Sequence, residues 1–155
     1  MDWKTLFFSP DGRIGRQSFW IGWLVLLGVN VVLGWIPLIG WALSLVTIYC
    51  NVCITAKRLH DMGKSGFLQI IPLVACPTLI VGAIAAVAGP AIMAGVADAN
   101  EAQVTAAILA GVGGMMLFFL AAFAIGLGFL IWIGVSNTQP GENRFGPEPT
   151  PAAIA

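Results

Sequence analysis

The chain has 155 residues, of which 59% are hydrophobic and only 9% carry a charge. Soluble domains usually carry about 25% charged residues, so this composition excludes a water-soluble globular protein and predicts that a lipid bilayer surrounds much of the chain. The formal net charge is zero, and without a basic excess we expect no nucleic-acid partner.

The N-terminal segment is predicted to lie at the membrane surface. Trp3, Leu6 and Phe7 share one face of a short helix, a pattern typical of segments that lie in the headgroup layer. Docking on a partner is the alternative. Residues 9–12, Ser-Pro-Asp-Gly, predict a turn after this segment.

Residues 17–56 form a charge-free run about twice as long as the ~20 residues that one helical crossing needs. Its 35–41 motif, Trp-Ile-Pro-Leu-Ile-Gly-Trp, predicts a tight hairpin, because proline and glycine favour a turn and tryptophan favours a membrane interface. We therefore predict spans at 19–36 and 41–56. The first run is longer than the apolar part of a signal peptide, so we expect it to be retained.

Two further charge-free runs follow, and they predict spans at 67–88 and 112–135. Gly89-Pro90 is predicted to end the third span. The intervening segment 91–103 is apolar and mildly acidic. It is compatible with a short interfacial helix or with an extension of either neighbour, and the sequence leaves this open.

Small residues recur four positions apart in the third and fourth spans, which lets helix backbones approach closely within lipid. We expect this pattern to pack the two spans together, with docking of another membrane protein or a second copy as the alternative. The pairs are Gly82 and Ala86, Ala85 and Gly89, Ala110 and Gly114, Ala122 and Gly126, and Ala124 and Gly128.

The basic residues predict the orientation, because short loops rich in Lys and Arg stay in the cytoplasm. With four crossings, every Lys and Arg falls on one face, whereas Asp98 and Glu101 fall on the other. The sequence therefore predicts an all-α, four-span membrane protein with cytoplasmic N- and C-termini. Residues 1–155 would form a single integral membrane domain that ends in a polar tail, 136–155.

The predicted spans contain no Asp, Glu, Lys, Arg or His. Ion and proton transporters usually keep an ionisable group at depth, so this pattern disfavours them. We expect the deep polar residues to act as interhelical hydrogen-bond partners; these are Asn30, Ser44, Thr47 and Thr78.

Cys50 and Cys53 form a C-x-x-C spacing, which elsewhere indicates redox chemistry or half a zinc site. A zinc site needs four ligands, whereas the sequence has one histidine and a single further cysteine, Cys76. We interpret the pair as buried thiols and expect no metal or cofactor.

Three polar strings hold the most specific information: 12–20 (GRIGRQSFW), 57–67 (KRLHDMGKSGF) and 140–147 (PGENRFGP). Together they resemble a bacterial family known as domain of unknown function 805. The resemblance covers nearly the whole chain, although Phe67 stands where tryptophan is most common. It implies a small multi-span protein of the bacterial inner membrane and implies no established activity or cofactor.

All three strings fall on the predicted cytoplasmic face and supply the candidate site. Arg58 and Asp61 are spaced to pair on one helical face. In a structural use, the basic groups pair with Asp61, Glu142 and backbone carbonyls; in a binding use, they hold an anionic phospholipid or another phosphate-bearing ligand. The candidate residues are Arg13, Arg16, Arg58, His60, Asp61, Lys64, Asn143 and Arg144.

The sequence does not predict a reaction. A phosphate loop at 63–66 lacks the required glycine spacing, and His60 lacks a second histidine or evident nucleophile. We expect a non-enzymatic packing or accessory protein, or a subunit of a larger complex. Its expected partners are the bilayer, anionic phospholipid, and another membrane protein or a second copy. A small channel or carrier for a neutral or amphipathic solute, an anionic-lipid-binding protein and a lipid-directed enzyme are the alternatives.

Overall fold

The structure is a computed structural model that describes residues 3–97 and 99–149. Asp2, Asp98 and the last part of the tail, 150–155, lie outside the described residues. The elements are α1 (Trp3–Phe8), α2 (Arg16–Leu33), α3 (Ile39–Asp61), the 3₁₀ helix η1 (Gly66–Gln69), α4 (Ile70–Val96) and α5 (Glu101–Val135).

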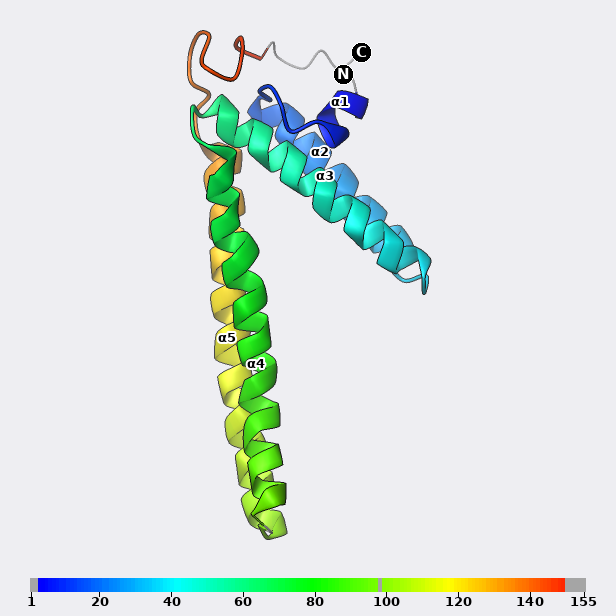
Figure 1. The fold of residues 1–155 in the computed structure, drawn as a ribbon, viewed down its shortest axis with the longest axis vertical. Coiled ribbons are helices and arrows are strands. Elements are labelled where there is room, and N and C mark those ends of the chain that lie inside the picture. The colour runs from blue at the N-terminus through cyan, green and yellow to red at the C-terminus, as the bar shows by residue number, and fades with distance from the viewer. Residues whose placement is uncertain (1–2, 98, 150–155) are drawn as a thin grey trace. The chain divides into compact units, whose positions relative to one another are not determined.

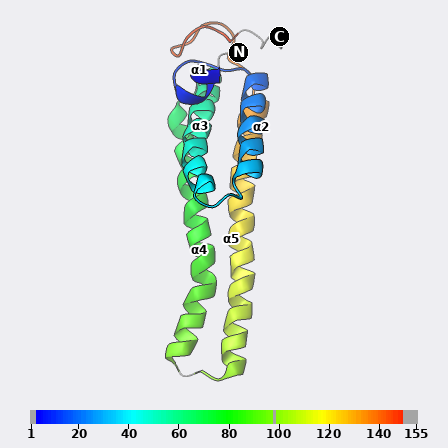
Figure 2. The same cartoon turned by 90° about the vertical axis from the view of Figure 1, so that its right-hand side faces the viewer.

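Four stretches are long and apolar enough to cross a membrane (Figures 1 and 2). These are α2, α3, residues Gly66–Gly95 and α5. Apart from an isolated bridge between Asn143 and Gly146, the regular structure of the described residues is helical. The predicted all-α class, with four helices long and apolar enough to span a membrane, is therefore confirmed.

The chain divides into two compact units, one formed by Met1–Gln69 with Ile131–Ala155 and the other by Ile70–Leu130. In the first unit, α2 and α3 form the hairpin predicted from the 35–41 motif. The prediction of one integral membrane domain stays a prediction.

In the first unit, α1 packs on the α2–α3 hairpin with part of the face that was predicted to contact the headgroup layer. Leu6 and Phe7 are buried, and their side chains surround Gly22 of α2 together with Ile54 of α3. The predicted shared face exists, since the Trp3 and Phe7 rings stack with centroids 5.9 Å apart. For Leu6 and Phe7 the predicted contact with the headgroup layer is wrong, because both side chains pack against the protein, where Gly22 leaves room for them.

In the second unit, several of the small residues bring α4 and α5 into contact. A Cβ built on Gly82 would lie 3.2 Å from the Phe118 ring, and one on Gly111 would lie 2.9 Å from the Val87 Cα atom. By contrast, a Cβ on Gly89 or Gly128 would meet nothing within 4 Å. Packing of the two spans therefore accounts for Gly82, as the small-residue pattern predicts, and also for Gly111, which is not in any of the predicted pairs.

The segment whose conformation the sequence left open is helical at both ends. Helix α4 continues through Pro90 to Val96, so the predicted end at Gly89-Pro90 is wrong. A proline removes only one backbone hydrogen bond, and apolar surroundings strongly favour keeping the rest of the helix. Asn100 and Gln103 then cap α5 reciprocally: the side-chain oxygen of each accepts the backbone N–H of the other, at 3.0 and 3.1 Å.

Helix bounds and predicted spans differ at other ends too. Helix α3 extends to Asp61, beyond the predicted limit at 56, and α5 begins at Glu101 rather than near 112. The span at 41–56 was predicted to end where the charge-free run ends, whereas α3 continues through Lys57, Arg58 and Asp61, whose side chains have partners within the protein. Asp61 and its neighbours show how this occurs.

Candidate functional site

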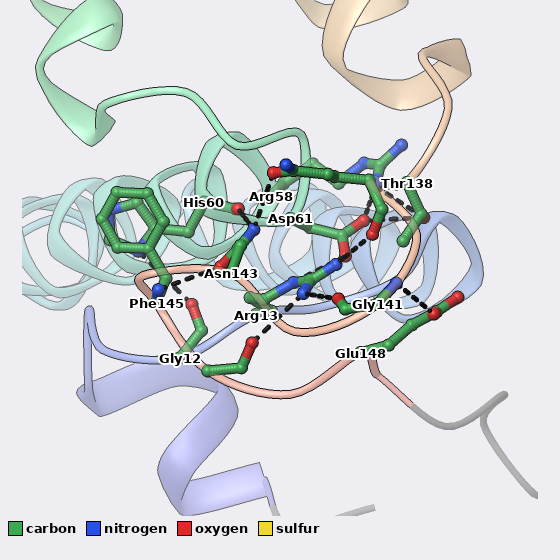
Figure 3. Close-up of polar contacts among 12 residues, drawn as sticks. Gly12, Arg13, Arg58, His60, Asp61, Thr138, Gly141, Asn143, Phe145 and Glu148 are labelled. Carbon is green, nitrogen blue, oxygen red and sulfur yellow. Dashed lines mark hydrogen bonds and ion pairs between the residues drawn. The ribbon is translucent and has the colours of Figure 1, made fainter.

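The three polar strings meet at the C-terminal end of α3, all within the first unit (Figure 3). Asp61 lies at the centre and its side chain is fully buried. Its Oδ1 atom accepts from Arg13 Nη2 at 3.3 Å, and its Oδ2 atom accepts from Arg58 Nη1 and from the Thr138 hydroxyl, the latter at 2.8 Å. We call Arg13, Arg58, Asp61 and Thr138 the Asp61 cluster.

The Asp61 cluster satisfies a buried carboxylate with two guanidinium groups and a hydroxyl. An isolated buried charge is costly, whereas paired and hydrogen-bonded charges are tolerated. The Arg58–Asp61 pair predicted from their spacing of three residues is confirmed. Arg13, which is distant in sequence, forms the second ion pair.

Basic and aromatic side chains also cap the C-terminus of α5. The last carbonyl oxygens of a helix have no intrahelical partner and carry its negative dipole end. Here Arg58 donates to the Ile133 oxygen at 2.9 Å and to the Ser136 oxygen. The Gly134 oxygen accepts from Trp20 Nε1 and the Val135 oxygen from Arg16 Nη1, each at 3.3 Å.

The tail after α5 folds over the end of α3 and is fastened by Arg13. The Arg13 guanidinium donates to the carbonyl oxygens of Gln139, Gly141 and Gly146, at 2.5, 2.6 and 3.1 Å. The backbone N–H of Gln139 donates to the Asp61 carbonyl oxygen at 2.8 Å. One arginine therefore joins the N-terminal string to both other strings.

His60 holds the same tail through its ring and its backbone. The His60 and Phe145 rings stack with centroids 3.8 Å apart and an interplanar angle of 7°. Asn143 Nδ2 donates to the His60 carbonyl oxygen at 3.0 Å, and His60 Nδ1 lies 3.3 Å from the Gly12 oxygen. These contacts fix the ring between two polar strings (Figure 3).

Two of the predicted site residues, Lys64 and Arg144, lie beside aromatic rings and outside the Asp61 cluster. Lys64 Nζ lies 5.6 Å from the Trp132 ring centroid, and the Arg144 guanidinium lies 4.6 Å from that of Phe145. Among residues 3–97 and 99–149 the ion pairs are those of Arg13 and Arg58 with Asp61. The structural use predicts that Lys64 and Arg144 pair with Asp61, Glu142 or backbone carbonyls. For the acidic groups this is corrected, since within the described ranges neither cation forms an ion pair and each lies over an aromatic ring.

Several residues that the site uses were not predicted from the sequence. Thr138 and Gln139 lie just before the third string, and their roles depend on how the tail folds back. Lys57 belongs to the second string and was not among the candidate residues, yet its side chain is buried and its ammonium group donates to the Thr5 carbonyl oxygen. The available indication was the position of Lys57 directly after the charge-free run 17–56, inside the same helix.

The cysteines and other possible ligands do not form a metal-binding arrangement in the described part of the chain. Cys50 and Cys53 are free thiols, and both are buried in the first unit. Within the described ranges, no three His, Cys, Asp or Glu side chains are grouped so that they could hold a metal ion. The interpretation of the pair as buried thiols agrees with this placement.

Comparison with known proteins identifies the family. The model for "Protein of unknown function (DUF805)" matches residues 7–147. The "Uncharacterized protein YiiR" of Escherichia coli strain K12 and that of Escherichia coli O157:H7 are each 39% identical to this chain over 75 residues, covering 41% of this chain and 51% of the relative. The chain thus spans about half the length of these curated relatives. No solved structure matches it. Since the family model covers most of the chain and all three polar strings, the protein belongs to the DUF805 family.

Proposed function

We propose that this protein is a non-enzymatic integral protein of the bacterial inner membrane that acts as an accessory protein or as a subunit of a larger complex. The observation that carries the proposal is the internal use of its polar residues. In the described ranges, every buried side-chain nitrogen or oxygen has a hydrogen-bond partner. The groups best suited to chemistry hold the chain together instead.

The same contacts support the proposed topology. Arg13 and Gln139 both bond to Asp61, so the segments before α2, after α3 and after α5 share one membrane face. Lys and Arg are abundant in these segments, and such segments resist translocation. We therefore place the shared face, with the Asp61 cluster, in the cytoplasm.

The geometry at Asp61 and His60 favours a structural role over catalysis. A general base needs an available lone pair near its substrate, whereas Asp61 accepts from two arginines and a threonine. The His60 ring is stacked on Phe145 and turned toward the Gly12 carbonyl. Both side chains are thus positioned to join segments of the protein.

The deep polar groups favour the same proposal over a solute pathway. Asn30 Nδ2 donates to the Leu26 oxygen at 2.8 Å, and the Thr47 hydroxyl donates to Asn30 Oδ1 at 3.3 Å. This pair links α2 to α3, as expected. Ser44 and Thr78 differ from the expectation, because their hydroxyls bond to carbonyl oxygens of their own helices.

Affinity purification in a mild detergent, followed by identification of the retained proteins, tests the proposal. We expect a defined membrane protein to co-purify with this protein in a stable ratio. In the reciprocal experiment, with the tag on that partner, we expect the partner to retain this protein. Purified protein reconstituted into proteoliposomes provides the opposing measurement. Purification without a partner, together with saturable flux of a neutral solute, would replace this proposal with the carrier alternative.

A further inference from the structure

A cavity of about 290 Å³ lies beside the Asp61 cluster in the first unit. It is bounded by α1, the loop that precedes α2, the first turn of α2 and the cytoplasmic end of α3. We call it the α1 cavity; its lining residues are Thr5, Leu6, Asp11, Gly12, Arg13, Ile14, Ser18 and Lys57.

Two buried basic side chains contribute to the wall of the α1 cavity. Lys57 is only 4% exposed, and the Arg13 side chain is 1% exposed. Asp11 is the acidic residue of the lining, and it lies in the exposed loop. The buried part of the lining therefore carries the positive groups, and its exposed part carries the carboxylate.

Neutral donors complement these charges. Ser18 lies in the first turn of α2 and lines the cavity. The N-cap of α2 is Gly15, which offers no side-chain cap. The first backbone N–H groups of a helix lack intrahelical partners and carry a partial positive charge that favours anions. Ammonium, hydroxyl and helix N–H groups together form a set that suits a phosphate oxygen.

The volume and position fit the headgroup of a lipid. A water molecule occupies roughly 30 Å³ of liquid, so the cavity admits a phosphate with the groups esterified to it. Leu6 and Ile14 supply apolar lining where the chain enters its first span. From these observations we propose that the α1 cavity binds the phosphodiester headgroup of an anionic phospholipid, with Lys57 and Ser18 facing the phosphate and Asp11 accepting from a headgroup hydroxyl. This goes beyond the proposed accessory role and does not depend on it.

Native mass spectrometry after extraction from vesicles of defined composition tests the site. The probes are phosphatidylglycerol, which has a phosphodiester and hydroxyl donors, and phosphatidylcholine, which has the phosphodiester but no hydroxyl or N–H donor in its headgroup. We expect retention of phosphatidylglycerol at one molecule per protein and at least tenfold weaker retention of phosphatidylcholine. Equal retention of both lipids, or of neither, would overturn the proposal.

Matched variants locate the site. Lys57→Gln should lower phosphatidylglycerol retention about tenfold, as expected for loss of one charge-assisted hydrogen bond. Lys64→Gln removes the same charge from an exposed residue outside the cavity and should leave retention unchanged. If the two variants lose lipid equally, the site is not the α1 cavity.

Ser18→Ala keeps the proposal testable if the buried Lys57 variant does not fold. It should lower retention several-fold without changing the thermal midpoint; unchanged retention in the folded variant contradicts the proposal. A competition experiment with inorganic phosphate distinguishes a lipid headgroup from free phosphate as the ligand of the α1 cavity. Lipid that millimolar phosphate does not displace supports a headgroup site, whereas phosphate binding without lipid retention overturns the assignment to lipid.

Discussion

Arg58 and Asp61 lie one helical turn apart at the end of α3 and form an ion pair in which both side chains are fully buried. Arg58 also donates to two terminal carbonyl oxygens of α5, and Asp61 also accepts from Arg13. The pair therefore connects the end of the second span to the N-terminal string and to the end of the fourth span.

Asp61→Ala should lower stability strongly, because it leaves two buried guanidinium groups without their carboxylate. Breaking a buried ion pair by removing one partner costs about 3–5 kcal/mol. At roughly 2–4 °C per kcal/mol, we expect a fall of about 10 °C in the thermal midpoint in detergent. Lys64→Ala, which removes an exposed cation over Trp132, should change it by a few degrees at most. Equal and small effects would mean that the cluster does not stabilise the protein.

Arg58→Lys should also be destabilising although it conserves the charge. A lysine ammonium is a single point of charge and cannot match the fork of a guanidinium that contacts Asp61, Ile133 and Ser136 together. We expect a loss of about 2 kcal/mol in thermal or chemical unfolding. Arg16→Lys is the matched control, since Arg16 is exposed and makes one contact with Val135. If neither substitution lowers the stability of the protein, the result would argue against capping of α5 by Arg58.

Phe145→Ala should loosen the tail without unfolding the helices. The ring stacks on His60, and aromatic pairs contribute about 0.5–1.5 kcal/mol beyond their burial. Hydrogen exchange at residues 139–147 should therefore become about 2- to 10-fold faster, while exchange in α2 and α3 stays unchanged. Phe67→Ala serves as the control because Phe67 is 77% exposed. If exchange in the tail does not change, the stack does not hold it.

Gly111→Ala should disturb the α4–α5 contact, whereas Gly113→Ala should not. A Cβ at Gly111 would lie 2.9 Å from the Val87 Cα atom, and one at Gly113 would meet nothing within 4 Å. Overpacking costs about 1–3 kcal/mol, but alanine in an open helical position gains up to ~1 kcal/mol over glycine. Thermal midpoints should move in opposite directions for the two variants. A stabilised Gly111→Ala protein would contradict the close approach of the two helices.

The sequence predicted those features that follow from composition and from spacing along one helix. Charge-free runs indicated four spanning helices, and a spacing of three residues indicated the Arg58–Asp61 pair. Neither kind of pattern contains information on how distant segments fold back. For this reason the inward packing of Leu6 and Phe7, the role of Thr138 and the His60–Phe145 stack were not predicted. The helix end predicted at Pro90 is wrong because the preference of proline to end a helix is weaker than the need to keep backbone hydrogen bonds in apolar surroundings.

The most direct test of the account asks whether the three polar strings share the cytoplasmic face. Single cysteines introduced as Lys4→Cys, Lys64→Cys and Glu142→Cys, all at exposed positions, can be labelled with a membrane-impermeant maleimide in intact cells and in inverted inner-membrane vesicles. The unmodified protein, with Cys50 and Cys53 buried, provides the background. With all three strings on the cytoplasmic face, we expect labelling of all three sites in inverted vesicles and of none in intact cells. Labelling of Glu142→Cys from outside, with Lys64→Cys labelled from inside, would contradict it, because the tail could then not reach Asp61.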